Sequence, residues 1–297
     1  ILLLFSRYWY LAVLYGVWLY IDWDTPSKGG RRSNWVRSWT VWKYFAEYFP
    51  IKLLCTAPLD PKYNYIMGFH PHGVLVVGAF GNFCTEGTGF SRLFPGLTPH
   101  LLMLPAWFRV PFFREYIMSG SMVPVSKDSL QYLLSRCGSG NAVFIVVGGA
   151  AESLQSIPGK HSVTLSGRKG FVRLALQNGA DLLPVYSFGE NELYEQVCLS
   201  PDSWGWRLQR LFQKHVGFAP CLFKGRAVFS ESGWGLNPFP RPITTVVGRP
   251  IRVTHSPVPS EEEVDHYHAL YMQGLKDLFD ENKISCGLAE SDTLEIL

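Results

Sequence analysis

The sequence predicts an α/β fold, with a sheet flanked by helices, preceded by an N-terminal membrane helix. Short apolar runs rich in β-formers alternate with segments of helical periodicity, and no internal repeat or linker divides them. The 297 residues suffice for one large or two small domains. Hydrophobic residues make up 47% of the chain and charged residues only 17%, which is more apolar than an ordinary soluble surface and indicates contact with lipid.

The first 21 residues are apolar apart from Ser6 and Arg7. As a single helix they would be ~31 Å long, close to the thickness of a bilayer core. A cleaved signal peptide is the alternative, but no small-residue cleavage site follows. We therefore expect residues 1–24 to be a membrane-embedded helix that ends a longer membrane region, with interfacial anchors at Trp9, Trp18, Tyr20 and Trp23.

The charge pattern after this helix orients the rest of the chain. Six basic residues and the single acid Glu47 lie between Lys28 and Lys52, so the positive-inside rule places residues 25–297 in the cytosol. The net charge is only +3 and the basic residues form no stripe, which predicts no nucleic-acid partner. Cysteines without a C-x-x-C pair are expected to be free thiols there, namely Cys55, Cys84, Cys137, Cys198, Cys221 and Cys286.

Local signals define the elements of the body. The aromatic-rich stretch 35–49, stopped by Pro50, either lies on the bilayer surface or packs in the core. Strands are predicted at residues 65–69, 100–104, 141–147, 182–188 and 243–247. Helices are predicted at residues 74–80, from the cap Ser126 to Cys137, at Gly170–Asn178 before Gly179, and after a capping box at Ser260. His266 and His268, in this last helix, are expected to be structural.

His70-Pro71-His72-Gly73 follows the first buried strand and is the leading candidate for an active site. Strand ends in open α/β sheets face the ligand crevice. One imidazole could accept a proton from a hydroxyl nucleophile at neutral pH. The alternatives are a metal held by both rings, as in a metal-dependent hydrolase, and a pair of structural turn histidines.

A second candidate region begins at the strand 143–147, which runs into Gly148-Gly149-Ala150-Ala151-Glu152. Glycines there allow a close approach to the backbone. Glu152 is a candidate partner for the His72 ring, which it would orient and whose charged form it would stabilise. A solvated glutamate at a helix start is the alternative.

Arg168 and Lys169 precede a predicted helix N-terminus. Cations there oppose the helix dipole unless an anion binds between them and the free N–H groups. We expect a phosphate-bearing substrate, with a solvated basic turn as the alternative. The chain has no G-x-S-x-G elbow, phosphate-binding P-loop or G-x-G-x-x-G fingerprint. A hydrolase with a serine nucleophile, nucleotide hydrolysis and dinucleotide binding are therefore not expected.

Motifs along nearly the whole chain together resemble the type 2 diacylglycerol acyltransferase family, with its diacylglycerol, monoacylglycerol and wax alcohol branches, and most of all the diacylglycerol branch. They are His70-Pro71-His72-Gly73, Asp22-Trp23-Asp24-Thr25-Pro26 with Gly29-Gly30-Arg31-Arg32, Tyr48-Phe49-Pro50, Val146-Val147-Gly148-Gly149-Ala150-Ala151-Glu152-Ser153, Arg168-Lys169-Gly170-Phe171-Val172, Tyr186-Ser187-Phe188-Gly189-Glu190-Asn191-Glu192 and Pro242-Ile243-Thr244-Thr245-Val246-Val247-Gly248.

The stretch from Arg168 to Val185 is also similar to the glycerolipid acyltransferases that carry H-x-x-x-x-D, which implies a glycerolipid-acyltransferase-like sheet. On that pattern His72 takes the place of the catalytic histidine. The usual aspartate is missing, because Val77 stands five residues after His72 and Leu75 five after His70. Its role would pass to another group, for which Glu152 is the candidate.

The resemblance implies transfer of a fatty acyl group from acyl-CoA to the free hydroxyl of diacylglycerol, giving triacylglycerol, without a cofactor. It implies His72, His70 and Glu152 as catalytic residues, and substrate contacts from Pro71, Gly73, Gly148, Gly149, Arg168, Lys169, Glu190 and Asn191. Acyl-CoA, diacylglycerol or a related neutral lipid, and the bilayer are the expected partners, and a homo-oligomer stays open. It also implies the endoplasmic reticulum membrane, with the catalytic domain facing the cytosol, and the lipid droplet surface. A monoacylglycerol or fatty alcohol acceptor and a non-catalytic lipid-binding protein are the remaining alternatives.

Overall fold

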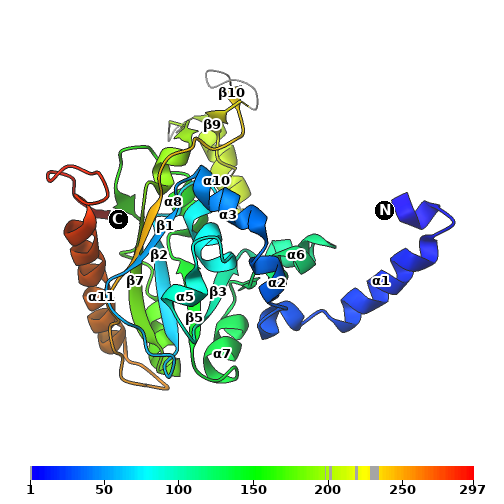
Figure 1. The fold of residues 1–297 in the computed structure, drawn as a ribbon, viewed down its shortest axis with the longest axis horizontal. Coiled ribbons are helices and arrows are strands. Elements are labelled where there is room, and N and C mark those ends of the chain that lie inside the picture. The colour runs from blue at the N-terminus through cyan, green and yellow to red at the C-terminus, as the bar shows by residue number, and fades with distance from the viewer. Residues whose placement is uncertain (1, 198, 201–202, 218–219, 228–233) are drawn as a thin grey trace.

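Seven strands form the central sheet of the computed structural model, which describes residues 2–197, 199–200, 203–217, 220–227 and 234–297 (Figure 1). Cys198 lies outside these residues. The strand order is β1-β11-β7-β2-β5-β3-β4. The strands are β1 (Lys52–Cys55), β2 (Tyr65–His70), β3 (Thr98–Met103), β4 (Met122–Pro124), β5 (Asn141–Val146), β7 (Asp181–Phe188) and β11 (Thr244–Val247). The five predicted strands are confirmed, with ends shifted by up to two residues.

Strand β2 lies in the middle of the sheet, between β5 and β7, and runs parallel to both. Strand β11 is antiparallel to β7, and β1 runs parallel to β11. The carboxyl ends of β2, β5 and β7 therefore meet at one edge, where open α/β sheets bind ligands.

The central strands are buried on both faces, as strands covered by helices on each side are. Because side chains alternate along a strand, Ile66 packs with the helices α7 (Lys127–Ser135), α9 (Gly170–Asn178) and α11 (Glu261–Asn282). Tyr65 and Met67 pack with the opposite layer around Phe83 and Phe90. Packing on both faces fixes the position and direction of β2, the strand that carries His70.

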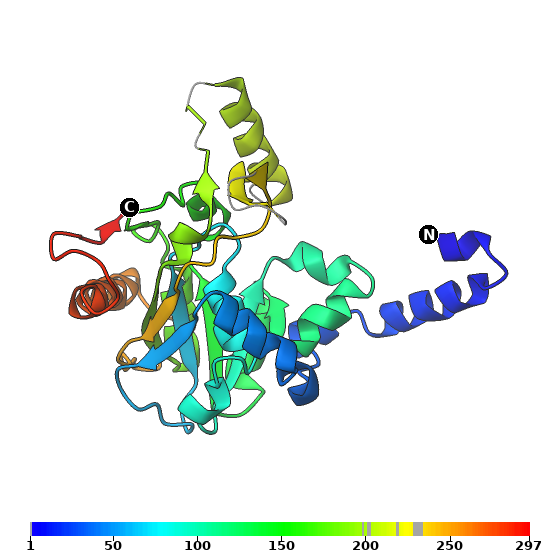
Figure 2. The same cartoon turned by 45° about the horizontal axis from the view of Figure 1, so that its top comes forward.

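Helices surround the sheet in both views (Figure 2). They are α1 (Trp9–Ile21), α2 (Asn34–Arg37), α3 (Thr40–Tyr48), α4 (Val77–Ala79), α5 (Phe90–Leu93), α6 (Phe113–Ser119), α7 (Lys127–Ser135), α8 (Gly149–Ser153), α9 (Gly170–Asn178), α10 (Trp204–Val216) and α11 (Glu261–Asn282). Short 3-10 or π turns lie at Leu2–Phe5, Thr25–Lys28, Phe80–Cys84, Pro105–Arg109 and Glu190–Leu193. Two small sheets are formed by β8 (Glu195–Gln196), β9 (Phe223–Arg226) and β10 (Trp234–Gly235), and by β6 (Ser162–Val163) and β12 (Glu295–Ile296).

The predicted helix caps are confirmed. The Ser126 hydroxyl accepts from Ser129 N at the start of α7, and Gly179 ends α9 in the left-handed conformation. Ser260 and Glu263 form the expected capping box of α11.

The prediction of one continuous helix over residues 1–21 is wrong. The carbonyl oxygen of Ser6 accepts from Trp9 N, and its hydroxyl accepts from Tyr8 N, so α1 starts only at Trp9. No helix in the described part of the chain combines the length and the apolarity needed to cross a bilayer. Helix α1 buries none of its residues and extends away from the sheet and its helices in both views.

The predicted helix at residues 74–80 begins later than expected, at Val77, and continues as a π turn to Cys84. Gly73 and Val76 have φ angles of 62° and 55°, which a right-handed helix cannot contain. The backbone after His72 is therefore a turn of four residues.

The core alternative for the aromatic stretch 35–49 applies to only some of its residues. Phe49 is 3% exposed and belongs to the core, whereas Trp35 is 74% and Tyr44 66% exposed. The stretch forms two helices, α2 and α3, rather than one.

Candidate active site

The His70-Pro71-His72-Gly73 segment lies at the carboxyl end of β2, between the loops that follow β5 and β7. His72 lines an apolar cavity of 420 Å³. The other lining residues come mainly from the turn after His72, from β3 and from α8, and include Val74, Leu75, Val76, Phe80, Leu101, Met103, Trp107, Met122, Ile145, Val146, Gly149, Ala150 and Ser153. The titratable ring of His72 thus lines a cavity whose apolar walls suit a hydrocarbon chain.

The His72 ring has a defined tautomer. Its Nδ1 lies 2.9 Å from the carbonyl oxygen of Gly73, which can only accept, so Nδ1 carries the proton. The other nitrogen, Nε2, keeps its lone pair. Burial lowers the pKa of His72 below its usual 6.5, partly offset by the hydrogen bond to Gly73, so the ring is neutral at pH 7 and able to accept a proton.

Glu152 contacts His72 differently from the prediction. Its Oε1 accepts from the backbone N–H of His72 at 2.6 Å, and its Oε2 accepts from Thr164 N at 2.7 Å. The expected contact with the imidazole is absent from the described structure, since the Gly73 carbonyl holds Nδ1 instead. Burial raises the pKa of Glu152 to about 7, although the two N–H donors and Arg168 favour its charged form.

Gly148 makes this position of Glu152 feasible. A Cβ atom at Gly148 would lie 2.0 Å from Glu152 Oε2. Only glycine allows the carboxylate to fold back over the start of α8 and reach His72.

His70 is fully buried beneath the site. Its Nε2 lies 3.0 Å from the hydroxyl of Tyr271, and that hydroxyl donates to the carbonyl oxygen of Gly68 at 3.1 Å. The hydroxyl has one proton, so His70 Nε2–H must be the donor in the first contact. Burial lowers the pKa of His70 to about 3, which keeps it neutral, so its role in this geometry is to hold the strand end.

Glu190 supports the turn that follows His72. Its Oε2 accepts from Gly78 N at 2.9 Å, and a Cβ on Gly73 would lie 2.7 Å from Glu190 Cγ. Burial raises the pKa of Glu190 to about 7. Asn191 donates to the carbonyl oxygen of Lys160 at 3.1 Å, and Pro71 is buried between the two histidines. These residues shape the loops rather than line the cavity.

The structure treats the two predicted cations differently. Lys169 Nζ lies 2.6 Å from Asp265 Oδ1 on α11, so a protein carboxylate supplies the anion that the helix start requires. Arg168 is exposed and makes no ion pair among the described residues. Its charge lowers the pKa of Glu152, which places it within electrostatic reach of the site.

The metal alternative lacks a ligand set. Within the described residues, no three His, Cys, Asp or Glu side chains are grouped as a metal ion requires. His268 is buried, with Nε2 3.1 Å from the carbonyl oxygen of Leu165, and His266 is exposed. Cys55, Cys84, Cys137 and Cys286 are free thiols.

Tyr271 is a site residue that the sequence analysis missed. No local sequence signal pairs it with His70, which lies 201 residues earlier.

Tyr271→Phe is expected to destabilise the protein by about 1–3 kcal/mol, because the His70 Nε2–H and the Gly68 carbonyl lose a buried partner. Thermal unfolding measures the effect. The matched control is Tyr267→Phe, one turn earlier on α11, whose hydroxyl bonds to Thr254 at the surface. A loss no larger than that of the control would contradict the role given to Tyr271.

Comparisons with known proteins identify the family of this chain. A family model described as diacylglycerol acyltransferase matches residues 1–297. Diacylglycerol O-acyltransferase 2 of Bos taurus is 57% identical over 97% of this chain and 80% of its own length, and that of Homo sapiens is 57% identical over 97% and 74%. The human 2-acylglycerol O-acyltransferase 3 is 53% identical over 99% of this chain and 86% of its own.

Among solved structures, a 1-acyl-sn-glycerophosphate acyltransferase from Thermotoga maritima covers 80% of this chain and 78% of its own, at 12% identity and a TM-score of 0.40. That likeness is too loose to place any residue. The family model and the relatives span essentially the whole chain, and the chain belongs to the diacylglycerol acyltransferase family.

Proposed function

We propose that this chain transfers a fatty acyl group from acyl-CoA to the free hydroxyl of diacylglycerol, forming triacylglycerol and CoA, with His72 as general base. Its family membership supports the reaction. The observation that carries the role of His72 is its neutral ring, tied through Nδ1 to Gly73 and lining an apolar cavity.

In the proposed mechanism, His72 Nε2 takes the proton of the acceptor hydroxyl as its oxygen attacks the thioester carbonyl carbon. The carbon–sulfur bond then breaks, and the His72 imidazolium returns the proton to the CoA thiolate. Atoms and charges balance without a cofactor or a covalent acyl-enzyme. General base catalysis of this kind contributes about 10²–10⁴-fold in rate.

In this proposal, backbone N–H groups at the start of α8 stabilise the negative oxygen that forms during attack. Gly149 and Ala150 line the same cavity as His72, and the first N–H groups of a helix have no carbonyl partner within it. N–H groups aimed at a developing oxyanion stabilise the transition state more than the substrate. We assign them this role, together with the backbone at Gly73 and Gly148.

The acceptor is tested by turnover of a long-chain acyl-CoA with diacylglycerol, monoacylglycerol and a fatty alcohol. We expect diacylglycerol to give the highest kcat/KM. A preference for monoacylglycerol would favour the alternative suggested by the 2-acylglycerol O-acyltransferase relative. Absence of turnover with all three would leave a lipid-binding protein and contradict the proposal.

Arg168 is the cation we assign to the CoA phosphates, because Lys169 already pairs with Asp265. Arg168→Gln is expected to raise the KM for acyl-CoA about tenfold and to leave the KM for diacylglycerol nearly unchanged, since a charge-assisted bond to phosphate is lost. Lys169→Gln is the neighbouring control, with a smaller effect. Equal KM values for acyl-CoA in wild type and Arg168→Gln would refute the assignment.

We also propose attachment to the endoplasmic reticulum membrane, with access to lipid droplets and residues 25–297 facing the cytosol. Helix α1 is apolar and none of its residues is buried, with Trp9 55% and Tyr20 83% exposed. The cationic stretch 28–52 follows it. These features favour insertion of α1 into the bilayer and retention of the following residues on the cytosolic side.

Ala289→Asn tests this orientation, because it creates an Asn-Glu-Ser glycosylation acceptor with Glu290 and Ser291 in a chain that has no Asn-x-Ser/Thr of its own. The variant should remain unglycosylated in microsomes that modify a luminal control protein. Modification at this position would place the C-terminal segment in the lumen and overturn the orientation.

A further inference from the structure

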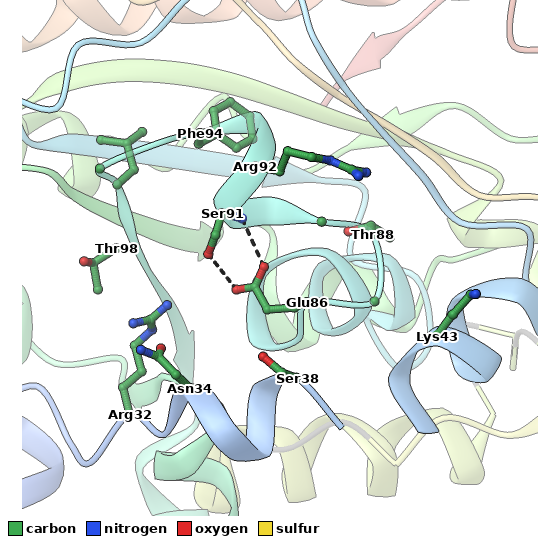
Figure 3. A pocket seen from close by; sticks show the side chains of 14 residues that line it. Arg32, Asn34, Ser38, Lys43, Glu86, Thr88, Ser91, Arg92, Phe94 and Thr98 are labelled. Atoms are coloured by element: carbon green, nitrogen blue, oxygen red, sulfur yellow. Dashed lines mark hydrogen bonds between the residues drawn. The ribbon is translucent and has the colours of Figure 1, made fainter. Parts of the chain in front are cut away.

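A second cavity, which is polar where the His72 cavity is apolar, lies near the start of β3. Its volume is 820 Å³, and it shares no lining residue with the His72 cavity. Its walls come from α2, α3 and the loop before α5, as Figure 3 shows. The side chains that carry its chemistry are Arg32, Ser38, Lys43, Thr88, Ser91 and Arg92.

The positive charge of this cavity is not balanced. Its one acid, Glu86, accepts from Arg37 Nη2 at 2.9 Å and from the hydroxyl and backbone N–H of Ser91 at 2.9 and 3.0 Å. Arg37 is fully buried behind the cavity, so the charge of Glu86 is matched by a cation that does not line it. Arg32 and Arg92 make no ion pair with any described residue.

The remaining cation, Lys43, adds to this imbalance. Its Nζ reaches only Glu47, at 4.0 Å, and both side chains are more than half exposed. A pair of this kind contributes little stability. Three cations therefore face the cavity with no firmly bound counter-charge.

Arg32 has a buried nitrogen that makes no hydrogen bond in the described structure. Its Nε is buried without a hydrogen-bond partner, as is the hydroxyl of Thr88 in the opposite loop. Burial lowers the pKa of Arg32 from its usual value, the neighbouring Arg37 lowers it further, and the carboxylate of Glu86 offsets part of this shift. Buried polar groups are normally paired, and like charges gathered without an anion cost free energy.

The chemistry of these side chains matches a phosphate group. Guanidinium groups bind phosphate oxygens with paired hydrogen bonds, and lysine adds a point charge. In Figure 3, Arg32 lies beside Asn34, and Arg92 extends toward Thr88 on the other side of the cavity. The hydroxyl groups of Ser38, Thr88 and Ser91 supply neutral partners for the same ligand.

The rim indicates where such a phosphate comes from. Trp35 and Trp39 adjoin the lining residues Asn34 and Ser38 in sequence, are 74% and 38% exposed, and meet edge to face at 5.0 Å. Exposed tryptophans beside cations are typical of the bilayer interface, where anionic lipids attract basic residues. We propose that this cavity binds the phosphate group of an anionic phospholipid headgroup at the membrane surface.

The test titrates the full chain, in a neutral detergent, with soluble dioctanoyl phosphatidic acid and follows the ligand-dependent shift in unfolding temperature. We expect saturable binding, with Arg92→Gln and Arg32→Gln each raising Kd about tenfold, since each removes charge-assisted hydrogen bonds. Arg92 is exposed, so Arg92→Gln should fold even if Arg32→Gln does not. The matched control is Arg136→Gln, an exposed arginine that does not line this cavity.

Two further ligands identify the source of the phosphate. Dioctanoyl phosphatidylcholine, whose choline cation offsets its phosphate, should bind at least about tenfold more weakly than phosphatidic acid. Inorganic phosphate that binds as tightly as phosphatidic acid would make this an ion site and overturn the headgroup assignment.

Two measurements on Arg92→Gln distinguish a failure of this proposal from a failure of the proposed acyl transfer. Binding of phosphatidic acid that is unchanged in Arg92→Gln would place the lipid elsewhere and overturn the proposal. The rate of acyl transfer in neutral detergent should be the same for Arg92→Gln and wild type, because Arg92 does not line the His72 cavity.

Discussion

Replacement of His72 by alanine is expected to lower kcat for acyl transfer by about 10²–10⁴-fold. The variant removes the only described titratable side chain that lines the apolar cavity, so no other group there can accept the proton of the acceptor hydroxyl. Binding of acyl-CoA should persist, because the walls of the cavity and Arg168 are unchanged. Initial rates with saturating substrates measure the loss, and a thermal unfolding curve confirms that the variant is folded.

His266→Ala is the control for this experiment, since His266 is exposed on α11, outside the site. The His266→Ala variant should catalyse acyl transfer at the wild-type rate. His70→Ala should instead lose stability, because it removes the ring that donates to Tyr271 inside the core. Near-normal turnover by a folded His72→Ala variant would contradict the role of His72 as base and favour a structural role for both histidines.

The second large effect is expected from Glu152→Gln. Both oxygens of Glu152 accept backbone N–H groups, and an amide has only one oxygen, so either His72 N or Thr164 N would face an NH₂ group. An unsatisfied buried donor costs about 1–3 kcal/mol in stability. Displacement of His72 from its position should also lower kcat by roughly 10–100-fold, since small misplacements at a reacting centre have effects of this size.

Glu192→Gln provides the matched control, because Glu192 accepts one backbone N–H, from Gly159, and makes no contact with His72. The double variant His72→Ala/Glu152→Gln should be hardly slower than His72→Ala, since Glu152 acts through the residue already removed. If the loss in kcat of the double variant equals the product of the two single losses, Glu152 acts independently of His72.

The sequence predicted five of the seven strands of the central sheet, without β1 and β4, because such apolar runs are local patterns. The run 65–69 and the turn at His70-Pro71-His72-Gly73 lie where apolar periodicity and Pro-Gly punctuation placed them. The caps at Ser126, Gly179 and Ser260 depend on a few neighbouring residues. These features need no knowledge of the tertiary structure.

Contacts between distant segments could not be predicted in this way. The missing aspartate of the H-x-x-x-x-D pattern suggested a carboxylate on the His72 ring, but the neighbouring Gly73 carbonyl holds the ring and Glu152 holds its backbone. Asp265 neutralises Lys169 from a helix almost a hundred residues later. Hydropathy treated residues 1–21 as one helix, because it does not include the hydrogen bonds of Ser6 that start α1 at Trp9.

The proposal that His72 Nε2 is the base is tested most directly by chemical rescue of His72→Ala with imidazole. The account predicts that added imidazole restores part of the acyl transfer rate. The restored rate should rise with pH through the pKa of imidazole, because only the neutral form accepts a proton. Rescue that follows the imidazolium form, or a His72→Ala variant that needs no rescue because it already turns over at the wild-type rate, would contradict the account.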